Sequence, residues 1–266
     1  DSELPEWMLF PLPGQMAIAR DTFSGPVKLS GPPGTGKTVI ALQRLAYLAK
    51  LYPSDRILFT TYSKTITQYM SDLYQLLPDA PQENVYFINV DDIVSEVANY
   101  ERVPQSERID KIWKDVFDNH LASNPTLQGI SGSWIRDEIE LVIMGNDFPH
   151  ENAYAMAERP GRVDLSETDL STIWNLYVSY QAALSASNTI NFPQLRALAR
   201  DKLDDGEPKY RAVVVDEGQD LTPVAISVLA RLLGDHLEQE NSFFFSEDRS
   251  QRFMASGIDY SRTGVN

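Results

Sequence analysis

The sequence predicts an α/β fold in which helices cover a parallel β-sheet and a long helical segment interrupts the sheet-forming sequence. Short apolar strands alternate with helical segments in the first part of the chain, which is typical of parallel sheets. The sequence becomes mostly helical near residue 100, and strands return after residue 187. We therefore expect an α/β domain formed by residues 1–99 and 188–266, with residues 100–187 inserted into it as a helical subdomain.

The first part of the chain alternates strictly between strands and helices. A short strand leads into a glycine-rich loop, and the next helix carries apolar residues at helical spacing. Pro53 and its polar neighbours end that helix. The expected elements are a strand at 27–30, a helix at 37–51, a strand at 56–61, a helix at 64–77 and a strand at 85–88.

The predicted insertion contains many large apolar side chains at helical spacings. Such a pattern is more typical of packing inside a helical subdomain than of a ligand site. The side chains expected in this core are Trp113, Phe117, Trp134, Ile139, Trp174, Tyr177 and Tyr180.

The last part of the chain returns to strands. Residues 212–215 form a fully apolar run that ends at Asp216, and a helix is expected at 222–233. Residues 242–245 form another buried strand, and residues 257–266 read as a loop. These strands complete the parallel sheet begun by the first part of the chain.

Composition and charge limit the classes of function. No apolar run approaches the roughly 20 residues that span a bilayer. The chain has no cysteine, which excludes disulfides and fits a cytoplasmic protein that does not contact a membrane. The 23 basic and 38 acidic side chains give a net charge of −15, which argues against a general basic surface for nucleic acid. A local groove that binds through stacking and main-chain amides stays possible.

The loop after the first strand matches the complete phosphate-binding pattern Gly-x-x-x-x-Gly-Lys-Thr, between a strand and a helix as that pattern requires. Its backbone N–H groups and the helix N-terminus favour a bound phosphate. Lys37 is expected to reach the β- and γ-phosphates of ATP, and the Thr38 hydroxyl to bind Mg²⁺. The expected nucleotide-binding residues are Gly31, Pro32, Pro33, Gly34, Thr35, Gly36, Lys37 and Thr38.

An acidic pair ends the apolar strand at 212–215. The strand delivers Asp216 to the carboxyl edge of the sheet, where open α/β sheets bind ligands, and Asp216 is expected to hold Mg²⁺. Glu217 follows at once and is placed to polarise an attacking water as a general base. The pair therefore predicts hydrolysis rather than phosphoryl transfer to a small molecule.

The residues around this pair resemble the UvrD/Rep-like superfamily 1 DNA helicases. The segment from Asp216 to Asp220 reads Asp-Glu-Gly-Gln-Asp, like the family's second motif Asp-Glu-x-Gln-Asp. Other segments occur in the family's order. They are Leu12–Gln15 (the Q motif), Phe59–Lys64 (motif Ia), Thr189–Leu195 (the segment before the acidic motif) and Glu247–Phe253 (motif III).

The resemblance implies a role for several further residues. Gln15 would read adenine, and Gln219 would couple the nucleotide site to the nucleic-acid cleft. Gln251 would sense the γ-phosphate and act in catalysis with Lys37 and Glu217.

The resemblance also implies contacts of Thr61, Tyr62 and Lys64 with single-stranded DNA or partly duplex DNA. The sequence departs from the family where Ser246-Glu247 replaces Gly-Asp and Asn191 replaces aspartate, which puts the coupling by motif III in question.

The resemblance covers only the family's first RecA-like domain with its helical insertion. The expected fold class is therefore a P-loop NTPase with a RecA-like, three-layer parallel sheet and an inserted helical subdomain. No segment resembles the family's later motifs, so we expect a second RecA-like domain to be absent from this chain and present in a full-length protein. That domain would supply the arginine finger, so this fragment alone is expected to hydrolyse ATP weakly.

The expected function is the ATP-binding and hydrolysing half of a DNA helicase or translocase that moves on single-stranded DNA and unwinds duplex. One alternative is an ATP-dependent regulatory or defence-system switch that keeps the helicase-like fold and acts on a protein partner. Another is a nucleotide or small-molecule kinase, which the acidic pair and the lack of an evident acceptor-binding lid disfavour.

Overall fold

The computed structural model describes residues 10–99, 104–123, 127, 129–157, 164–203, 207–248 and 263–265. Its centre is a five-stranded sheet in which all neighbouring strands are parallel, in the order β1-β5-β4-β2-β3. The strands are β1 (Val27–Ser30), β2 (Ile57–Thr60), β3 (Val85–Phe87), β4 (Ala212–Val215) and β5 (Phe243–Glu247). The parallel sheet predicted from the alternating sequence is therefore confirmed.

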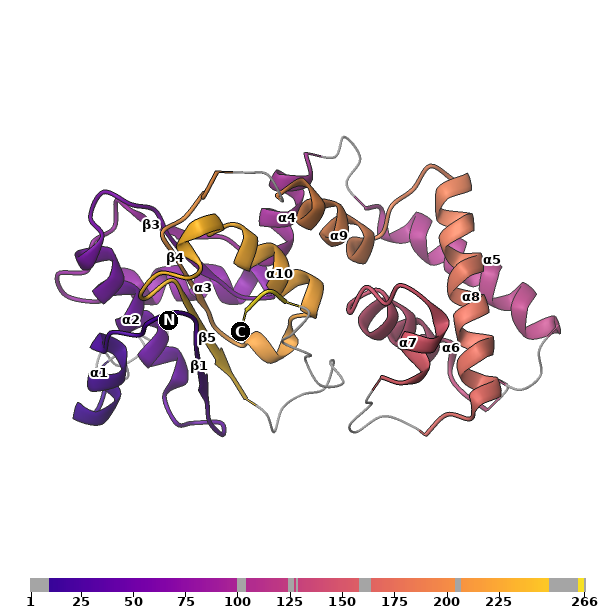
Figure 1. Cartoon of the computed structure of the whole chain (residues 1–266), viewed down its shortest axis with the longest axis horizontal. Helices are drawn as coiled ribbons and strands as arrows, with labels where there is room; N and C mark the ends of the chain where they lie inside the picture. Colours follow the sequence, from indigo (N-terminus) through magenta and orange to yellow (C-terminus); the bar gives the residue numbers. More distant parts are fainter. Residues whose placement is uncertain are drawn as a thin grey trace, which may run out of the picture.

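Helices cover both faces of the sheet (Figure 1). Alternating side chains of β4 divide the core, because Ala212 and Val214 pack on one face while Val213 and Val215 pack on the other. One face is covered by α1 (Pro13–Arg20), α2 (Lys37–Leu51) and α3 (Lys64–Gln75), and the other by α4 (Val90–Ala98), α9 (Phe192–Lys202) and α10 (Pro223–Arg231). This is the predicted three-layer arrangement.

The helices between α4 and α9 pack around a hydrophobic cluster of their own. All described members of this cluster lie between Ile109 and Leu184. Trp113 stacks on Phe117 and meets Tyr180 edge-on, so the predicted core role of these aromatic side chains is confirmed. The helical elements are α5 (Ser106–Ser123), α6 (Gly132–Asp137), the π-helix η3 (Glu138–Ile143), α7 (Glu151–Ala155) and α8 (Glu167–Ala186), and they lie to the right of the sheet in Figure 1.

Polar contacts connect these helices to the α/β layers. The Val224 amide at the start of α10 donates to the Gly145 carbonyl oxygen at 3.0 Å. Arg200 of α9 pairs with Asp147 at 2.6 Å between Nη1 and Oδ2. The helical part therefore contacts the α/β layers next to α10, the helix that follows the acidic motif.

Most predicted strands and helices match the structure closely, and the differences are instructive. The strand predicted at 242–245 runs further, through Glu247, so the first residues of motif III lie inside the sheet. Two helices, α4 and α9, were not predicted. Their N-caps Asn89 and Asn191 each accept a hydrogen bond from a backbone amide three residues later, a pattern that the sequence alone offers as a helix start.

Short helices complete the described chain. They are the 3₁₀ turns η4 (Gly218–Asp220) and η5 (Gly234–His236). Across the ranges given above, the structure contains no helix with the length and apolar character that crossing a membrane requires. Most of the loop predicted at 257–266 lies outside the described residues.

Candidate active site

The phosphate-binding loop connects β1 to α2 at the carboxyl edge of the sheet. Gly34 and Gly36 have φ angles of 77° and 81°, a left-handed conformation that glycine adopts without steric cost. Pro32 to Thr35 are exposed to solvent. The loop therefore has the backbone geometry that its sequence predicts and lies open to a ligand.

Lys37 begins α2 and turns its side chain back into the loop. The side chain is only 9% exposed. Its Nζ atom donates to the carbonyl oxygens of Gly31 at 2.8 Å and Pro32 at 3.1 Å, and lies 3.7 Å from Oδ2 of Asp248. The ammonium group is thus already at the loop, bonded to oxygen atoms that phosphate oxygens can replace.

Gln15 lies on α1 against the same loop. Its Nε2 donates to the Thr35 carbonyl oxygen at 2.9 Å, and its Oε1 accepts from the Leu12 amide at 2.7 Å. A Cβ atom on Gly36 would lie 2.6 Å from Nε2, so a larger residue there would displace the Gln15 amide. Each end of the Gln15 amide keeps one hydrogen-bonding position, which is what a base such as adenine requires.

A buried arginine fastens α1 to α2. Arg44 has no exposed surface, and its guanidinium donates to the carbonyl oxygens of Ala19 and Asp21 at the end of α1 and to Oδ1 of Asn241. Burial lowers the pKa of Arg44 to about 10, within the range where the group stays charged at neutral pH. Arg44 therefore holds in place the helix that carries Gln15.

Asp216 follows β4 directly and is 1% exposed. Burial raises the pKa of its carboxyl group, while hydrogen bonds from the hydroxyls of Ser246 and Thr38 act in the opposite direction. Because Thr38 and Asp216 contact each other, a hydroxyl and a carboxylate oxygen lie together beside the phosphate loop. Mg²⁺ prefers oxygen ligands and uses few protein side chains when it also binds phosphates, so these residues fit Mg²⁺.

Glu217 has an unusual backbone conformation. Its φ of 53° and ψ of 40° place it in the left-handed region, which costs a residue with a side chain about 1–2 kcal/mol. Its side chain is half-buried, and Oε2 accepts a hydrogen bond from Nε2 of Gln219. Strain of this kind is tolerated where a side chain must point in a particular direction.

Gln219 connects the acidic pair to the end of β5. It is 2% exposed, and its Oε1 accepts from the Asp248 amide at 2.9 Å while its Nε2 reaches Glu217. Asp248 in turn lies near Lys37. A continuous set of polar contacts therefore runs from Glu217 through Gln219 and Asp248 to the lysine of the phosphate loop.

The loop after β2 contains the residues predicted to touch nucleic acid. The Asp216 amide donates to the Thr60 carbonyl oxygen at 3.1 Å, so this loop begins beside the acidic pair. Thr61 is buried, whereas Tyr62 is 37% exposed. Lys64 is exposed, and its Nζ pairs with Oδ2 of Asp92 at 3.0 Å.

Arg196 is an additional cation beside this loop. It is 5% exposed, pairs with Asp91 at 2.7 Å, and lies over the Tyr62 ring at 5.9 Å from the ring centroid. The carboxylates of α4 therefore pair with both Lys64 and Arg196, which lowers the positive potential of the surface where single-stranded DNA is predicted to bind.

The departure at Asn191 and the predicted sensor Gln251 have different outcomes. Asn191 caps α9 with its side chain, so at this place it does what an aspartate would do at a helix N-terminus. Gln251, which was predicted to sense the γ-phosphate, lies outside the described residues.

Ser246, Asp248 and Arg196 contact the site and were not predicted as site residues. Ser246 was noted only as a departure from the family pattern. A buried strand that ends in Ser-Glu-Asp is itself a signal, because fully buried polar residues at a carboxyl edge need partners. The partner of Arg196, Asp91, is 105 residues away in the sequence, so no local pattern announces that pair.

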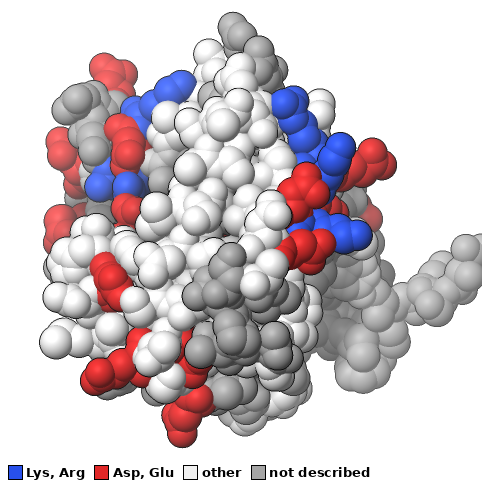
Figure 2. Space-filling view, turned by 90° about the vertical axis from the view of Figure 1, so that its right-hand side faces the viewer, with Lys and Arg blue, Asp and Glu red and all other residues white. Residues whose placement is uncertain are grey.

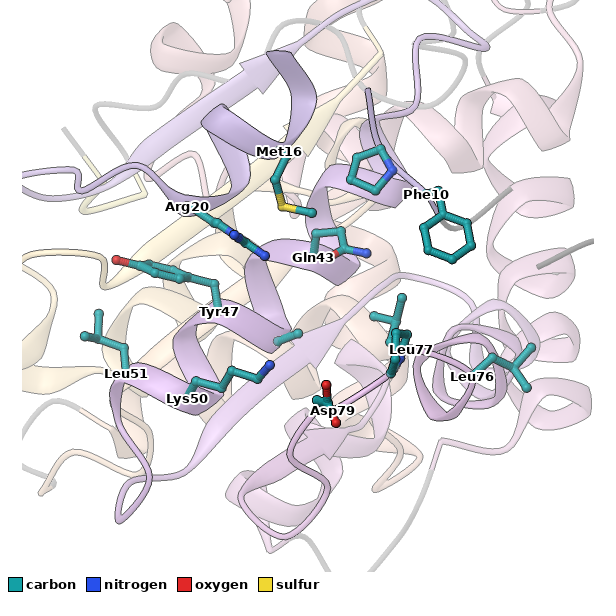
Figure 3. A pocket seen from close by; sticks show the side chains of 13 residues that line it. Phe10, Met16, Arg20, Gln43, Tyr47, Lys50, Leu51, Leu76, Leu77 and Asp79 are labelled. Carbon is teal, nitrogen blue, oxygen red and sulfur yellow. The ribbon is translucent and has the colours of Figure 1, made fainter. Parts of the chain in front are cut away.

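A cavity of about 800 Å³ lies beside α1 and α2 (Figure 3). Met16 and Arg20 of α1, Gln43 and Tyr47 of α2, and Leu77 after α3 line it. The described residues that line it include none from the phosphate loop at 31–38, so this cavity is not the phosphate site.

Comparison with known proteins agrees with the phosphate loop and the parallel sheet. A search of curated proteins found no match to the chain. The family model AAA_19, described as an AAA domain, matches residues 15–254, which include Gln15, the phosphate loop and the acidic pair. The chain therefore belongs to the AAA_19 family of AAA domains, which are P-loop NTPases.

Proposed function

We propose that this chain is the ATP-binding and hydrolysing half of a UvrD/Rep-like DNA helicase or translocase. The observation that carries the proposal is the set of contacts from Glu217 through Gln219 and Asp248 to Lys37. It joins the general base to the phosphate-binding lysine and to the end of β5. A change at the γ-phosphate can then alter the position of several elements at once, as a motor requires.

Hydrolysis follows from the placement of the side chains. Phosphate oxygens replace the carbonyl partners of Lys37, whose ammonium charge then faces the phosphates. Glu217 accepts the proton of the attacking water, and Gln219 holds one carboxylate oxygen so that the other is available. Gln15 binds adenine while its amide stays oriented by Leu12 and Thr35.

Thr38 and Asp216 would hold Mg²⁺. When bound, Mg²⁺ would neutralise the negative charge that develops on the phosphates during hydrolysis. The chain's own contribution is to keep a hydroxyl and a carboxylate together next to the loop before any ligand arrives.

Coupling to DNA is supported by the position of the loop after β2. The loop begins next to the acidic pair, because β2 and β4 are adjacent strands and Thr60 pairs with Val215. Tyr62 offers an exposed aromatic face on which a base can stack, and Arg196 orients the ring. A movement of the acidic motif can thus reach the predicted DNA contacts Tyr62 and Lys64 across the spacing between two adjacent strands of the sheet, whereas the predicted contact Thr61 is buried.

The charge of the surface favours a second candidate function, an ATP-dependent switch that acts on a protein partner. On the face shown in Figure 2, basic side chains occur in small groups beside acidic ones rather than as a continuous basic area. Lys64 is paired with Asp92, and the chain carries a net charge of −15. A protein partner does not require a basic surface, whereas the phosphate backbone of DNA does.

ATPase assays with and without single-stranded DNA separate the two candidates. We expect DNA to increase the rate for the wild-type protein, and Tyr62→Ala to reduce that increase while leaving the rate without DNA unchanged. Tyr69→Ala is the matched control, since Tyr69 is exposed to a similar extent on α3 but lies away from the loop. A rate that DNA does not change, measured on a protein in which this chain is joined to a second RecA-like domain, would contradict the helicase proposal and favour the switch.

The rate of this chain alone is expected to be low. An arginine finger supplied by a second RecA-like domain contributes about 10³–10⁵ in rate. Duplex unwinding by the 266-residue chain at the rate of a complete motor would refute the proposed division of labour.

A further inference from the structure

Ser246 is a fully buried serine of β5 that lies beside Asp216. Residues Val213–Val215 of β4 pair in register with Phe243–Phe245, so the next residue of each strand continues the same pairing. Phe244 packs on the face of the sheet that α2 covers. Because side chains alternate along a strand, Ser246 points to that same face, where α2 carries Thr38.

The Ser246 hydroxyl donates a hydrogen bond to Oδ1 of Asp216. The Thr38 hydroxyl bonds to the same carboxyl group. Asp216 is therefore held by two hydroxyls from two different elements, β5 and α2. Hydrogen bonds to a carboxylate are about twice as strong as neutral ones, so each restricts the rotation of the carboxylate about its side-chain bond.

The two hydroxyls have different environments. Thr38 is partly exposed at the start of α2 and is itself placed to bind Mg²⁺, whereas Ser246 has no exposed surface. The Ser246 hydroxyl is thus available only to its buried neighbours. Without it, the remaining hydrogen-bond partners of Asp216 among the described residues are the Thr38 hydroxyl and the Glu217 backbone amide, beside the negative charge of the Glu217 side chain.

We propose that Ser246 is a positioning residue that fixes the Asp216 carboxylate in the orientation that binds Mg²⁺ with a nucleotide. This inference rests on the proposed ATP site. It assigns to the serine a function that a glycine at this position cannot perform. The serine does not contact the nucleotide, so its effect is confined to the metal-dependent part of nucleotide binding.

The test measures binding of a fluorescent ATP analogue, mant-ATP, to the 266-residue chain in EDTA and in excess Mg²⁺. For the wild-type protein we expect Mg²⁺ to tighten binding. For Ser246→Ala we expect an unchanged affinity for mant-ATP in EDTA. The increase in affinity that Mg²⁺ produces should be about tenfold smaller than in wild type, the size expected for losing one hydrogen bond to a charged group. Titration of Mn²⁺ by electron paramagnetic resonance in the presence of ADP should show the same loss.

Ser242→Ala is the matched control. Ser242 is also fully buried at the start of β5, but its hydroxyl donates to the Leu237 carbonyl oxygen at 2.6 Å, away from the site. It should retain the full Mg²⁺-dependent gain. If Ser246→Ala does not fold, Ser246→Cys replaces it, because the thiol has nearly the same shape and is a weak donor; we expect an intermediate loss of the gain.

Two results would overturn the inference. One is an equal Mg²⁺-dependent gain in wild type and the Ser246 variants. The other is an equal loss of affinity in EDTA and in Mg²⁺, which would mean that the serine supports the pocket as a whole. A wild-type protein whose affinity does not depend on Mg²⁺ would instead refute the proposed ATP site, and with it this inference.

Discussion

Gly218 occupies the middle of the acidic motif, and its replacement by alanine is expected to destabilise the protein through one contact. A Cβ atom at this position would lie 2.2 Å from Cζ of Phe245 and 2.5 Å from its Cε2. Carbon atoms in contact prefer about 3.5–4.0 Å, so the ring or the backbone must move by about 1 Å. The backbone angles of Gly218 lie outside the left-handed region, so the conformation itself does not exclude alanine.

The ring has little freedom to move. Phe245 is 2% exposed and stacks on Phe243 in the core between the sheet and α10. Overpacking of this kind costs about 1–3 kcal/mol, which lowers the melting temperature of a protein of this size by about 2–12 °C. Thermal unfolding followed by circular dichroism measures the change.

A double variant isolates the cause. Leucine at position 245 lacks the ring atoms that the new Cβ would meet, so Gly218→Ala combined with Phe245→Leu should lose less stability than the sum of the two single variants. Gly14→Ala is the control, because no atom lies within 4 Å of its Cβ position; since Gly14 lies in α1, the change should leave the melting temperature unchanged or slightly raised. Gly218→Ala with the melting temperature of the wild type, or strict additivity in the double variant, would refute the steric reasoning.

Three further predictions follow from buried or paired charges. Because burial raises the pKa of Asp216 above its unfolded value, ionisation of this carboxyl group costs stability as the pH rises from the unfolded pKa to the raised folded pKa. Asp216→Asn should therefore melt higher than wild type near pH 7, with a difference that shrinks as the pH falls through the raised pKa and is gone below about 4, the unfolded value. A lower melting temperature at pH 7 would contradict this. Asp92→Asn removes the partner of Lys64 and should tighten binding of single-stranded DNA. The plot of log binding constant against log salt concentration should become steeper by about 0.7, the value for one added phosphate contact. An unchanged slope would mean that Lys64 does not contact the bound DNA. Arg44→Lys keeps the positive charge but loses the guanidinium hydrogen bonds to the end of α1 and to Asn241, so thermal unfolding should show a loss of about 2 kcal/mol in the free energy of unfolding. Arg20→Lys, at an exposed position, should change the melting temperature little. Equal melting temperatures of both variants would contradict the proposed role of Arg44 in holding α1 against α2.

The fold was predictable because the strongest local patterns agree with the tertiary structure. The strands at 27–30 and 212–215 and the helix at 37–51 have the predicted bounds. The central strands β2, β4 and β5 are buried along their whole length and therefore read as largely apolar runs, whereas β1 alternates half-buried and exposed residues. The strand order was not predictable, because it depends on contacts between segments that are far apart in the sequence.

The sequence indicated the phosphate loop and the acidic pair of the candidate site, but not their contacts or the neighbouring residues Ser246, Asp248 and Arg196. The phosphate loop and the acidic pair follow from spacing alone. The left-handed backbone of Glu217 and the bonds from Gln219 to both Glu217 and Asp248 depend on how η4 packs against β5. A residue type gives its chemical capacity, whereas the partner that uses this capacity is fixed only by the fold.

The ion pairs near the predicted DNA contacts show the same limit. The sequence presents Lys64 as a cation available to a phosphate. The structure pairs it with Asp92 at the start of α4, a helix that the sequence analysis did not assign. The charge available at that surface is therefore lower than the residue types suggest.

The central claim is that Glu217 is the general base of an ATP hydrolase whose phosphates bind at Lys37. Single-turnover hydrolysis of γ-labelled ATP by the wild-type protein and Glu217→Gln, with binding of mant-ATP measured on the same samples, tests it most directly. The claim predicts that Glu217→Gln binds nucleotide as tightly as wild type and releases labelled phosphate at least a hundredfold more slowly, since general-base catalysis contributes about 10²–10⁴ in rate. Equal rates of phosphate release from the two proteins would contradict it.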